Sequence, residues 1–380
     1  MNRTLRTVAL VFIATCAIGA WAAPKKYPNK KPSASQKAQA VQQRVAKDRA
    51  TLLAAMPLYA QRADALAAAQ SIAQRRDLNQ AWVAHIIGQA RFMPSIAQAV
   101  LPPSGPGARN WNLYRERFVE PKRINAGVAF WQKHRETLER AQAQTGVPAE
   151  IIVGIIGIET LYGKNAGGYR VIDALCTLAF DFPVAHPRAA QRTTFFQSEL
   201  EAFLALTARN NLDPLSLRGS YAGAMGMPQF MPSSWEKYGV DYDGDGKVDL
   251  YGSPADVIGS VANYFKAFQW QPGMPTHYPL ELDPIRADLA TLLLPDIKPS
   301  FSPFDMVAHG VRLDESAQRH PGALALLELQ NGNDAPLYLA GTDNFYAITR
   351  YNWSSYYALA VIELGRAVAK AMPMPTAMQK

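Results

Sequence analysis

One carboxylate stands alone in an apolar segment of the chain, and its setting suits acid catalysis. Residues 151–163 read IIVGIIGIETLYG, with Glu159 as their only charged residue. At helical spacing Glu159 shares a stripe with Ile152 and Ile156, so it should leave a buried face close to the end of a helix. Burial and the negative end of the helix dipole both favour a protonated carboxyl. Such a group can protonate a leaving oxygen near neutral pH.

Other interpretations of Glu159 remain open from the residues alone. It could lie on the surface at a helix end, or a structural Arg170 or Arg192 could neutralise it. The next acidic residue is Asp173, so the segment offers no second carboxylate of the kind that most glycosidases use. The residues therefore predict one acid that acts alone or with a distant partner.

A loop rich in glycine and aromatic residues is the second candidate. Residues 219–235 read GSYAGAMGMPQFMPSSW. Small residues let a ligand approach the backbone, while Ser220, Gln229 and the aromatic rings offer hydrogen bonds and flat faces to sugars. A packed structural loop is the alternative interpretation.

An Asp-rich segment follows, with the spacing of a calcium loop. Asp241, Asp243 and Asp245 alternate ahead of a glycine, and Lys247 takes the position that binds calcium through its backbone carbonyl. The twelfth position is Gly252, where an ordinary EF-hand has a glutamate. Both a bound Ca²⁺ and an Asp-rich turn without one are compatible with this segment.

Helices are the elements predicted to hold these residues. Helical patterns cover 123–144, 190–210, 256–270 and 353–372, with another helix starting near Pro148. Residues 275–350 lack a helical period and contain turn pairs such as Asn331-Gly332, which predicts a small β-containing subdomain. The predicted fold class is mainly α with a small β insert.

The N-terminus predicts export. Residues 1–22 combine Arg3 and Arg6, an apolar run and an Ala-Trp-Ala cleavage site, as in a secretory signal peptide. Residues 23–36 are rich in Pro, Lys and Ser and should form a tether. The predicted location is the periplasm. An N-terminal anchor helix and lipidation of Cys16 are the alternatives.

Composition excludes several classes of protein. With 48% hydrophobic and 18% charged residues among 380, most of the chain should fold. The net charge is +8, but Lys and Arg form no periodic stripe, so nucleic acid is not a predicted partner. The histidines never take HExxH spacing, which argues against a metallopeptidase of that type.

Four motifs taken together resemble one family. GIIGIETLYGKN, GSYAGAMGMPQFMPSSW, DYDGDGKVDL and ITRYNWSSYYALAV, in this order, are similar to the membrane-bound lytic murein transglycosylase B family, glycoside hydrolase family 103. The resemblance implies a lysozyme-like catalytic core with an EF-hand-like calcium loop. The expected divisions are a helical region at 37–110, the core at 111–274 with its calcium loop at 241–256, the β-containing subdomain at 275–350 and a helix closing the cleft, with the tail, at 351–380.

The same resemblance assigns roles by position. Glu159 would be the single catalytic acid and base, and Asp256 would complete the structural calcium site with Asp241, Asp243, Asp245 and Lys247. No cofactor is implied for catalysis. The residues expected to bind the peptidoglycan glycan strand are Ser220, Gln229, Tyr351, Asn352, Tyr357, Tyr114 and Arg192, although the sequence around Arg192 departs from the spacing usual in the family.

The implied reaction is a non-hydrolytic cleavage. Glu159 would protonate the oxygen between N-acetylmuramic acid and N-acetylglucosamine, and then take the proton of the muramyl C6 hydroxyl as this attacks C1, leaving a 1,6-anhydro end. A muramidase that admits water to the same site and a wall-binding module without activity are the alternatives. A monomer is expected. The sequence identifies no protein partner among cell-wall synthesis or division proteins.

Overall fold

The structure is a computed structural model that describes residues 58–102 and 109–373, with scattered positions between 35 and 51. The predicted signal peptide at 1–22, Cys16 and nearly all of the tether at 23–36 lie outside the described residues.

Helices dominate the chain, as predicted. The helices are α2 (Ala63–Arg76), α3 (Gln80–Gly88), α4 (Pro94–Ala99), α5 (Trp111–Phe118), α6 (Pro121–Lys133), α7 (Arg135–Thr145), α8 (Ala149–Thr160), α9 (Val171–Phe180), α10 (Ala189–Arg209), α11 (Pro232–Tyr238), α12 (Pro254–Ala267), α13 (Leu289–Leu292), α14 (Pro303–Ala308), α15 (Glu315–Gln318), α16 (Asp343–Tyr351) and α17 (Ser355–Ala371).

The predicted helices at 190–210, 256–270 and 353–372 correspond to α10, α12 and α17, each within three residues at both ends. The helix predicted at 123–144 is instead two helices, α6 and α7, because the backbone leaves helical geometry at His134, with φ −116° and ψ 26°. Gly146 then ends α7 in the left-handed conformation expected of a glycine at that place, with φ 72°.

Two antiparallel sheets accompany the helices in the described residues. A short pair joins β1 (Tyr169–Arg170) to β2 (Arg218–Gly219). A four-stranded sheet has the order β4-β3-β6-β5 and contains β3 (His277–Leu282), β4 (Val311–Leu313), β5 (Ala325–Asn331) and β6 (Asp334–Gly341). The turn predicted at Asn331-Gly332 is confirmed, since Asn331 pairs with Asp334 across it and Gly332 has a φ of 69°.

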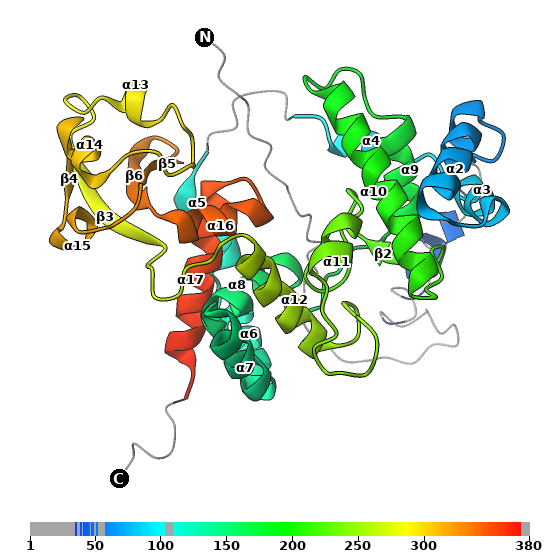
Figure 1. Ribbon diagram of the computed structural model, residues 1–380, viewed down its shortest axis with the longest axis horizontal. Coiled ribbons are helices and arrows are strands. Elements are labelled where there is room, and N and C mark those ends of the chain that lie inside the picture. The colour runs from blue at the N-terminus through cyan, green and yellow to red at the C-terminus, as the bar shows by residue number, and fades with distance from the viewer. Residues whose placement is uncertain are drawn as a thin grey trace, which may run out of the picture.

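The four-stranded sheet belongs to a part of the molecule with its own hydrophobic cluster. This cluster lies apart from the main core and includes Leu292, Met306, Val311, Leu313, Leu324 and Leu326. In Figure 1 the sheet with α13 to α15 lies at one end of the long axis, α2 and α3 lie at the other, and α8 lies between them. The boundary expected at residue 350 falls inside α16, so the last residues of that division are helical.

Helix α8 crosses the main core against α17, and two glycines let the helices approach closely. A Cβ atom at Gly154 would lie 2.3 Å from the carbonyl oxygen of Val361, and one at Gly365 would lie 2.1 Å from that of Glu150. No larger residue fits either place without moving a backbone. The contact brings the end of α8, which carries Glu159, to the start of α17, which carries Tyr357.

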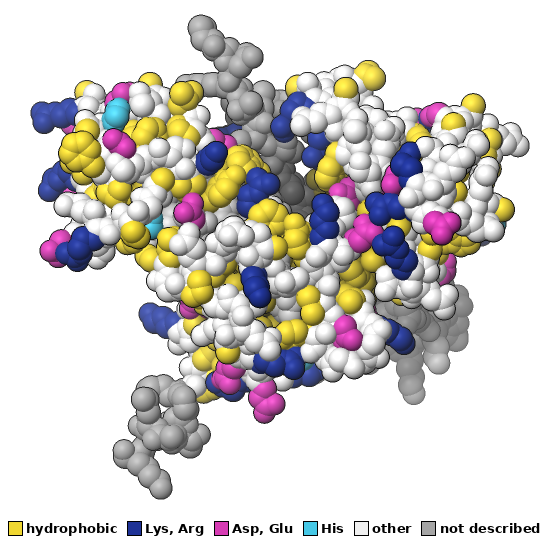
Figure 2. Space-filling view, viewed as in Figure 1, with side chains coloured by type: hydrophobic (Ala, Val, Ile, Leu, Met, Phe, Trp, Pro, Cys, Tyr) yellow, Lys and Arg dark blue, Asp and Glu magenta, His cyan; other side chains and the backbone are white. Residues whose placement is uncertain are grey.

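Within the described ranges, no single helix has the length and apolar character to cross a membrane, although α7 and α8, bent by 117° at their junction, would pass as a pair by length and composition alone. Basic side chains are spread over the face in Figure 2 and are interspersed with acidic ones.

Candidate active site

Glu159 occupies the last turn of α8, where the sequence predicts it. The helix ends at Thr160 because Leu161 and Tyr162 adopt left-handed backbone, with φ of 51° and 57°. The hydroxyl of Thr160 donates a hydrogen bond of 2.8 Å to the carbonyl of Met227. The end of α8 is thereby attached to the Gly-rich loop that follows β2.

A tyrosine from the C-terminal part of the chain binds the carboxyl of Glu159. The hydroxyl of Tyr357, in the first turn of α17, donates to Oε1 of Glu159 at 2.5 Å. The ring of Tyr357 stacks on that of Tyr351, with centroids 6.5 Å apart and an interplanar angle of 17°. The Tyr351 hydroxyl in turn donates to the carbonyl of Pro228 at 2.6 Å. These contacts join α8, α16, α17 and the Gly-rich loop around one carboxyl.

Burial raises the pKa of Glu159 to about 7, although the hydrogen bond from Tyr357 favours the carboxylate and opposes this shift. In the described part of the chain, no basic side chain forms an ion pair with Glu159. Arg170 instead pairs with Asp173 at 2.6 Å, and Arg192 lies over the ring of Phe196. Neutralisation of Glu159 by Arg170 or Arg192 is therefore not what the structure shows.

The raised pKa predicts a pH-dependent gain in stability from Glu159→Gln. Well below pH 4.5 the carboxyl is protonated in both the folded and the unfolded protein, so its ionisation does not change the free energy of unfolding. Between pH 4.5 and 7 the carboxyl ionises in the unfolded protein but stays protonated in the folded one, so the free energy of unfolding falls and then stays lowered above pH 7, whereas glutamine has no such penalty. The melting temperature of the variant should exceed that of the parent at pH 8, and the difference should vanish at pH 4. An equal difference at both pH values would contradict the raised pKa.

Ser220 and Gln229 help to shape the Gly-rich loop from within. The Oγ atom of Ser220 accepts the backbone N–H groups of Ala222 and Ala224, at 3.2 and 3.0 Å. Gln229 adopts left-handed backbone with a φ of 53°, and its amide donates to the carbonyl of Ala166 at 3.1 Å. The same amide also donates to the carbonyl of Gly226, within the loop, at 2.9 Å. Both side chains remain half-buried rather than enclosed.

The remaining sugar-binding candidates divide into two groups. Burial raises the pKa of Tyr114 on α5, and the charge of Glu159 raises it further; burial and the same charge also raise the pKa values of Tyr351 and Tyr357. Asn352 follows α16 in extended backbone, directly after Tyr351. Arg192 is different: it lies on α10, its charge acts on Tyr221, and it makes no hydrogen bond or ion pair to Glu159 among the described residues.

The Asp-rich loop gathers three carboxylates. Oxygens of Asp241, Asp243 and Asp256 lie within 4.8 Å of one another, and this group does not include Asp245. Buried Asp256 accepts the N–H groups of Tyr242 and Asp249, each at 2.7 Å. Asp256 therefore reaches the loop from α12. This arrangement suits a hard cation with oxygen ligands.

A backbone contact joins the Asp-rich loop to the Gly-rich loop. The backbone N–H of Met227 donates to the carbonyl of Leu250 at 2.8 Å, which attaches the Asp-rich loop to the Gly-rich loop. A Cβ atom on Gly226 would lie 2.5 Å from the same carbonyl oxygen. A change in the Asp-rich loop can thus reach the backbone two residues before Gln229.

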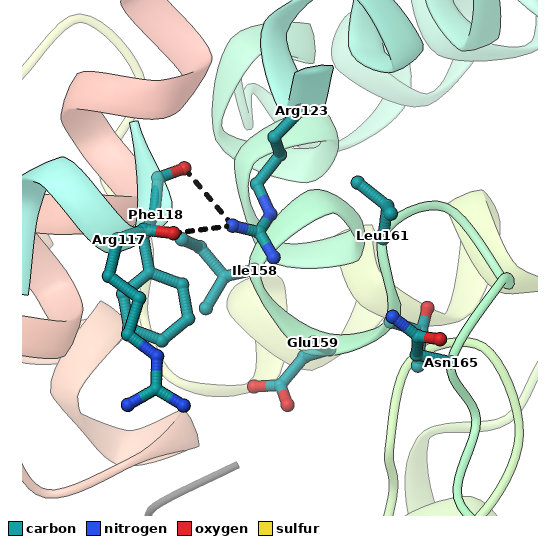
Figure 3. Close-up of a pocket in the computed structure, with 8 residues that line it drawn as sticks. Arg117, Phe118, Arg123, Ile158, Glu159, Leu161 and Asn165 are labelled. Atoms are coloured by element: carbon teal, nitrogen blue, oxygen red, sulfur yellow. Dashed lines mark hydrogen bonds between the residues drawn. The ribbon is translucent and has the colours of Figure 1, made fainter. Parts of the chain in front are cut away.

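A pocket beside Glu159 includes residues that the sequence analysis missed. Figure 3 shows Arg117, Arg123, Leu161 and Asn165 around Glu159, with Arg123 approaching from above. Arg123 shares a buried stripe with Gly127 and Phe130 on α6. The sequence did contain a signal for this residue, namely an arginine on an otherwise apolar stripe of a helix. A buried arginine needs compensating partners, which marks it as a candidate functional residue. The complete lining is Arg117, Phe118, Arg123, Ile158, Glu159, Thr160, Leu161 and Asn165.

Known proteins are similar to this chain in sequence and in fold. The family model described as the transglycosylase SLT domain matches residues 61–366. The chain is 42% identical over 296 residues to membrane-bound lytic murein transglycosylase B of Escherichia coli K12, covering 75% of this chain and 77% of that protein. The crystal structure of soluble lytic transglycosylase SltB1 from Pseudomonas aeruginosa is similar with a TM-score of 0.72 and 39% identity, covering 81% of this chain and 99% of that one.

Two further solved structures hold ligands. The E. coli lytic transglycosylase Slt35 in complex with calcium has a TM-score of 0.70 and 37% identity, covering 82% of this chain and 95% of that one. SltB3 from P. aeruginosa in complex with NAG-anhNAM-pentapeptide has a TM-score of 0.65 and 28% identity, covering 80% of this chain and 81% of that one.

These similarities define the class as lysozyme-like lytic transglycosylases, which are lyases that cleave peptidoglycan. The chain belongs to the transglycosylase SLT family, and its lytic transglycosylase activity is of the type named in these relatives.

Proposed function

We propose that the protein cleaves the β-1,4 bond between N-acetylmuramic acid and N-acetylglucosamine without water, using Glu159 as acid and then as base. The observation that carries the proposal is the buried carboxyl of Glu159, with its pKa raised to about 7 and one hydrogen bond from Tyr357. In the described part of the chain, no other carboxylate contributes to this pKa shift. A single group of this kind suits a reaction that needs an acid first and a base second.

Glu159 begins the reaction by giving its proton to the glycosidic oxygen. As the bond to the leaving sugar breaks, C1 of the muramyl ring gains positive charge, and the 2-acetamido oxygen stabilises it as an oxazolinium ion. The carboxylate of Glu159 then accepts the proton of the C6 hydroxyl while O6 attacks C1 and expels the acetamido oxygen. The product carries a 1,6-anhydro bridge, and Glu159 is protonated again.

The structure offers a physical reason for this order of events. A pKa of about 7 leaves much of Glu159 protonated at neutral pH and makes the resulting carboxylate a useful base. The hydroxyl of Tyr357 can keep its hydrogen bond to the carboxylate after the proton has left. The C6 hydroxyl is part of the same sugar, and its effective concentration, on the order of 10⁵ M or more when well aligned, can exceed that of water.

Side chains around Glu159 would bind the glycan strand. The residues proposed to line the cleft are Ser220, Gln229, Tyr351, Asn352, Tyr357 and Tyr114, of which Tyr357 contacts the carboxyl directly. We assign Arg192 to a more distant substrate contact, because its charge acts on Tyr221 in the Gly-rich loop. The complex of SltB3 with NAG-anhNAM-pentapeptide supports a peptidoglycan substrate for this chain.

The Asp-rich loop is proposed to bind a structural Ca²⁺. The carboxylates of Asp241, Asp243 and Asp256 fit a cation, because three negative groups within 4.8 Å repel one another without one. Asp245 and the Lys247 carbonyl would complete the ligand set implied by the motif. The Slt35 complex with calcium supports this proposal. The ion would brace the Gly-rich loop and take no part in the chemical step.

We also propose that the enzyme acts in the periplasm after removal of residues 1–22. The membrane-bound relative from E. coli supports a location in the cell envelope. Lipidation of Cys16 is the alternative, and mass spectrometry of the mature N-terminus would separate the two.

Mass spectrometry of soluble products from purified peptidoglycan tests the proposed chemistry. An intramolecular attack should give muropeptides lighter by one water than those with reducing ends, because no water is added to C1. Treatment with borohydride provides the control, since it reduces free ends and leaves anhydro ends unchanged. Products with reducing ends would instead identify a muramidase, and an absence of products would favour a wall-binding module.

A further inference from the structure

Arg123 is a buried cation in the wall of the pocket that holds Glu159. Its exposed fraction is 6%, and it lies on α6 with its guanidinium directed toward the pocket (Figure 3). Burial also lowers the pKa of this group, because the charged form is harder to hold away from water. A charge at such a position needs strong compensation.

Two of its three nitrogens bind backbone carbonyls. Nε donates to Gly157 at 3.0 Å, and Nη1 donates to Arg117 at 3.1 Å and to Phe118 at 3.4 Å. Gly157 lies near the end of α8, while Arg117 and Phe118 end α5. The guanidinium therefore lies at the negative ends of two helices, which compensates part of its charge.

The third nitrogen is left for another partner. Nη2 of Arg123 points into the pocket on the side of Glu159 and makes no hydrogen bond within the described residues (Figure 3). No carboxylate in the same part of the chain forms an ion pair with this guanidinium. The pocket thus combines a buried cation, two unused N–H groups and the carboxyl of Glu159, whose pKa burial raises.

We infer that Arg123 binds a carboxylate of the substrate next to the bond that Glu159 acts on. This inference rests on the proposed function, because it takes the occupant of the pocket to be peptidoglycan. An oxyanion is the natural partner for unused guanidinium N–H groups that are shielded from water. Peptidoglycan offers one at the lactyl group of muramic acid where the peptide is absent, and others along the stem peptide. Arg123 would then be a specificity residue for acidic glycan.

Binding to the Glu159→Gln protein tests this assignment without turnover. The three probes are a peptide-free GlcNAc-MurNAc tetrasaccharide, the same glycan with its stem peptides and the neutral tetramer of N-acetylglucosamine. Adding Arg123→Gln should weaken binding of a carboxylate ligand by about tenfold or more, because a charge-assisted hydrogen bond is lost. Binding of the neutral tetramer should change by less than about twofold.

The pattern over the probes decides the outcome. A loss with the peptide-free glycan identifies the lactyl carboxylate, and a loss confined to the peptide-bearing glycan identifies the stem peptide. An equal loss with all three probes, or no loss with any, would overturn the inference. Calorimetry supplies the affinities. Arg135→Gln is the matched control, because Arg135 lies at the exposed start of α7 and pairs with Glu139.

A second comparison covers the case in which Arg123→Gln does not fold. The Glu159→Gln protein with Arg123 intact is titrated with the peptide-free tetrasaccharide and with the peptide-bearing glycan, each before and after its carboxylates are converted to amides. The inference expects about a tenfold loss on amidation of at least one of the two glycans, and unchanged affinities for both would reject it. If the wild-type enzyme makes no anhydro products while the carboxylate preference holds, the proposed function fails alone. If anhydro products form without that preference, the Arg123 assignment fails alone.

Discussion

Glu159→Gln should lower the rate of peptidoglycan cleavage by about 10³-fold or more, because it removes a group proposed to act as acid and base in one cycle. Glutamine keeps the size of the side chain and can still accept the hydrogen bond from Tyr357. The loss should therefore appear in the rate while binding of the glycan changes little. Release of soluble muropeptides over time, followed by chromatography, measures it.

The control for this experiment is Glu139→Gln, an exposed change on α7 that leaves the pocket intact. It should retain the parental rate. Retention of more than about a tenth of the activity by Glu159→Gln would show that another group protonates the leaving oxygen, and the one-acid mechanism would then be wrong.

Removal of calcium should lower the melting temperature of the wild-type protein by roughly 5 °C or more. A ligand present at about 100 times its Kd stabilises the folded state by about 2.7 kcal/mol, and chelation removes this contribution. Asp241→Ala deletes one of the three clustered carboxylates and should leave a protein whose melting temperature no longer responds to calcium. Differential scanning calorimetry with EGTA and with added Ca²⁺ provides the measurement.

Asp283→Ala is the comparison for charge alone, since Asp283 is exposed and lies outside the Asp-rich loop. This variant should keep the full calcium response. A response of equal size in the wild-type and Asp241→Ala proteins would place the ion elsewhere. A fall in cleavage rate on chelation, at a temperature where the protein stays folded, would be consistent with the connection from Leu250 to Met227.

Much of the fold class could be predicted because it depends on local patterns. Helical spacing identified α10, α12 and α17, and an Asn-Gly pair identified the turn between β5 and β6. The break between α6 and α7 could not be predicted in this way. His134 carries no strong turn signal, and the sequence on both sides favours a helix.

The resemblance to a family extended the prediction to distant parts of the chain. It associated Tyr351 and Tyr357 with Glu159, and the structure places their rings and the carboxyl in one connected group. The resemblance assigned no role to Arg123, because none of the four motifs includes this residue. Arg192, carried over with the rest, lies on α10, where its charge interacts with Tyr221 of the Gly-rich loop, and its role in binding the glycan stays a prediction.

Short-range spacing was enough to place Glu159 at the end of an apolar helix and three aspartates in one turn, because neighbours along the chain determine both. The raised pKa of Glu159 could be established only from the folded chain. It depends on burial by remote segments and on a hydroxyl 198 residues away, and local sequence contains neither. The place of Arg123 in the pocket also depends on the tertiary structure. Its two unused N–H groups reach the pocket only because α5, α6 and α8 pack together there.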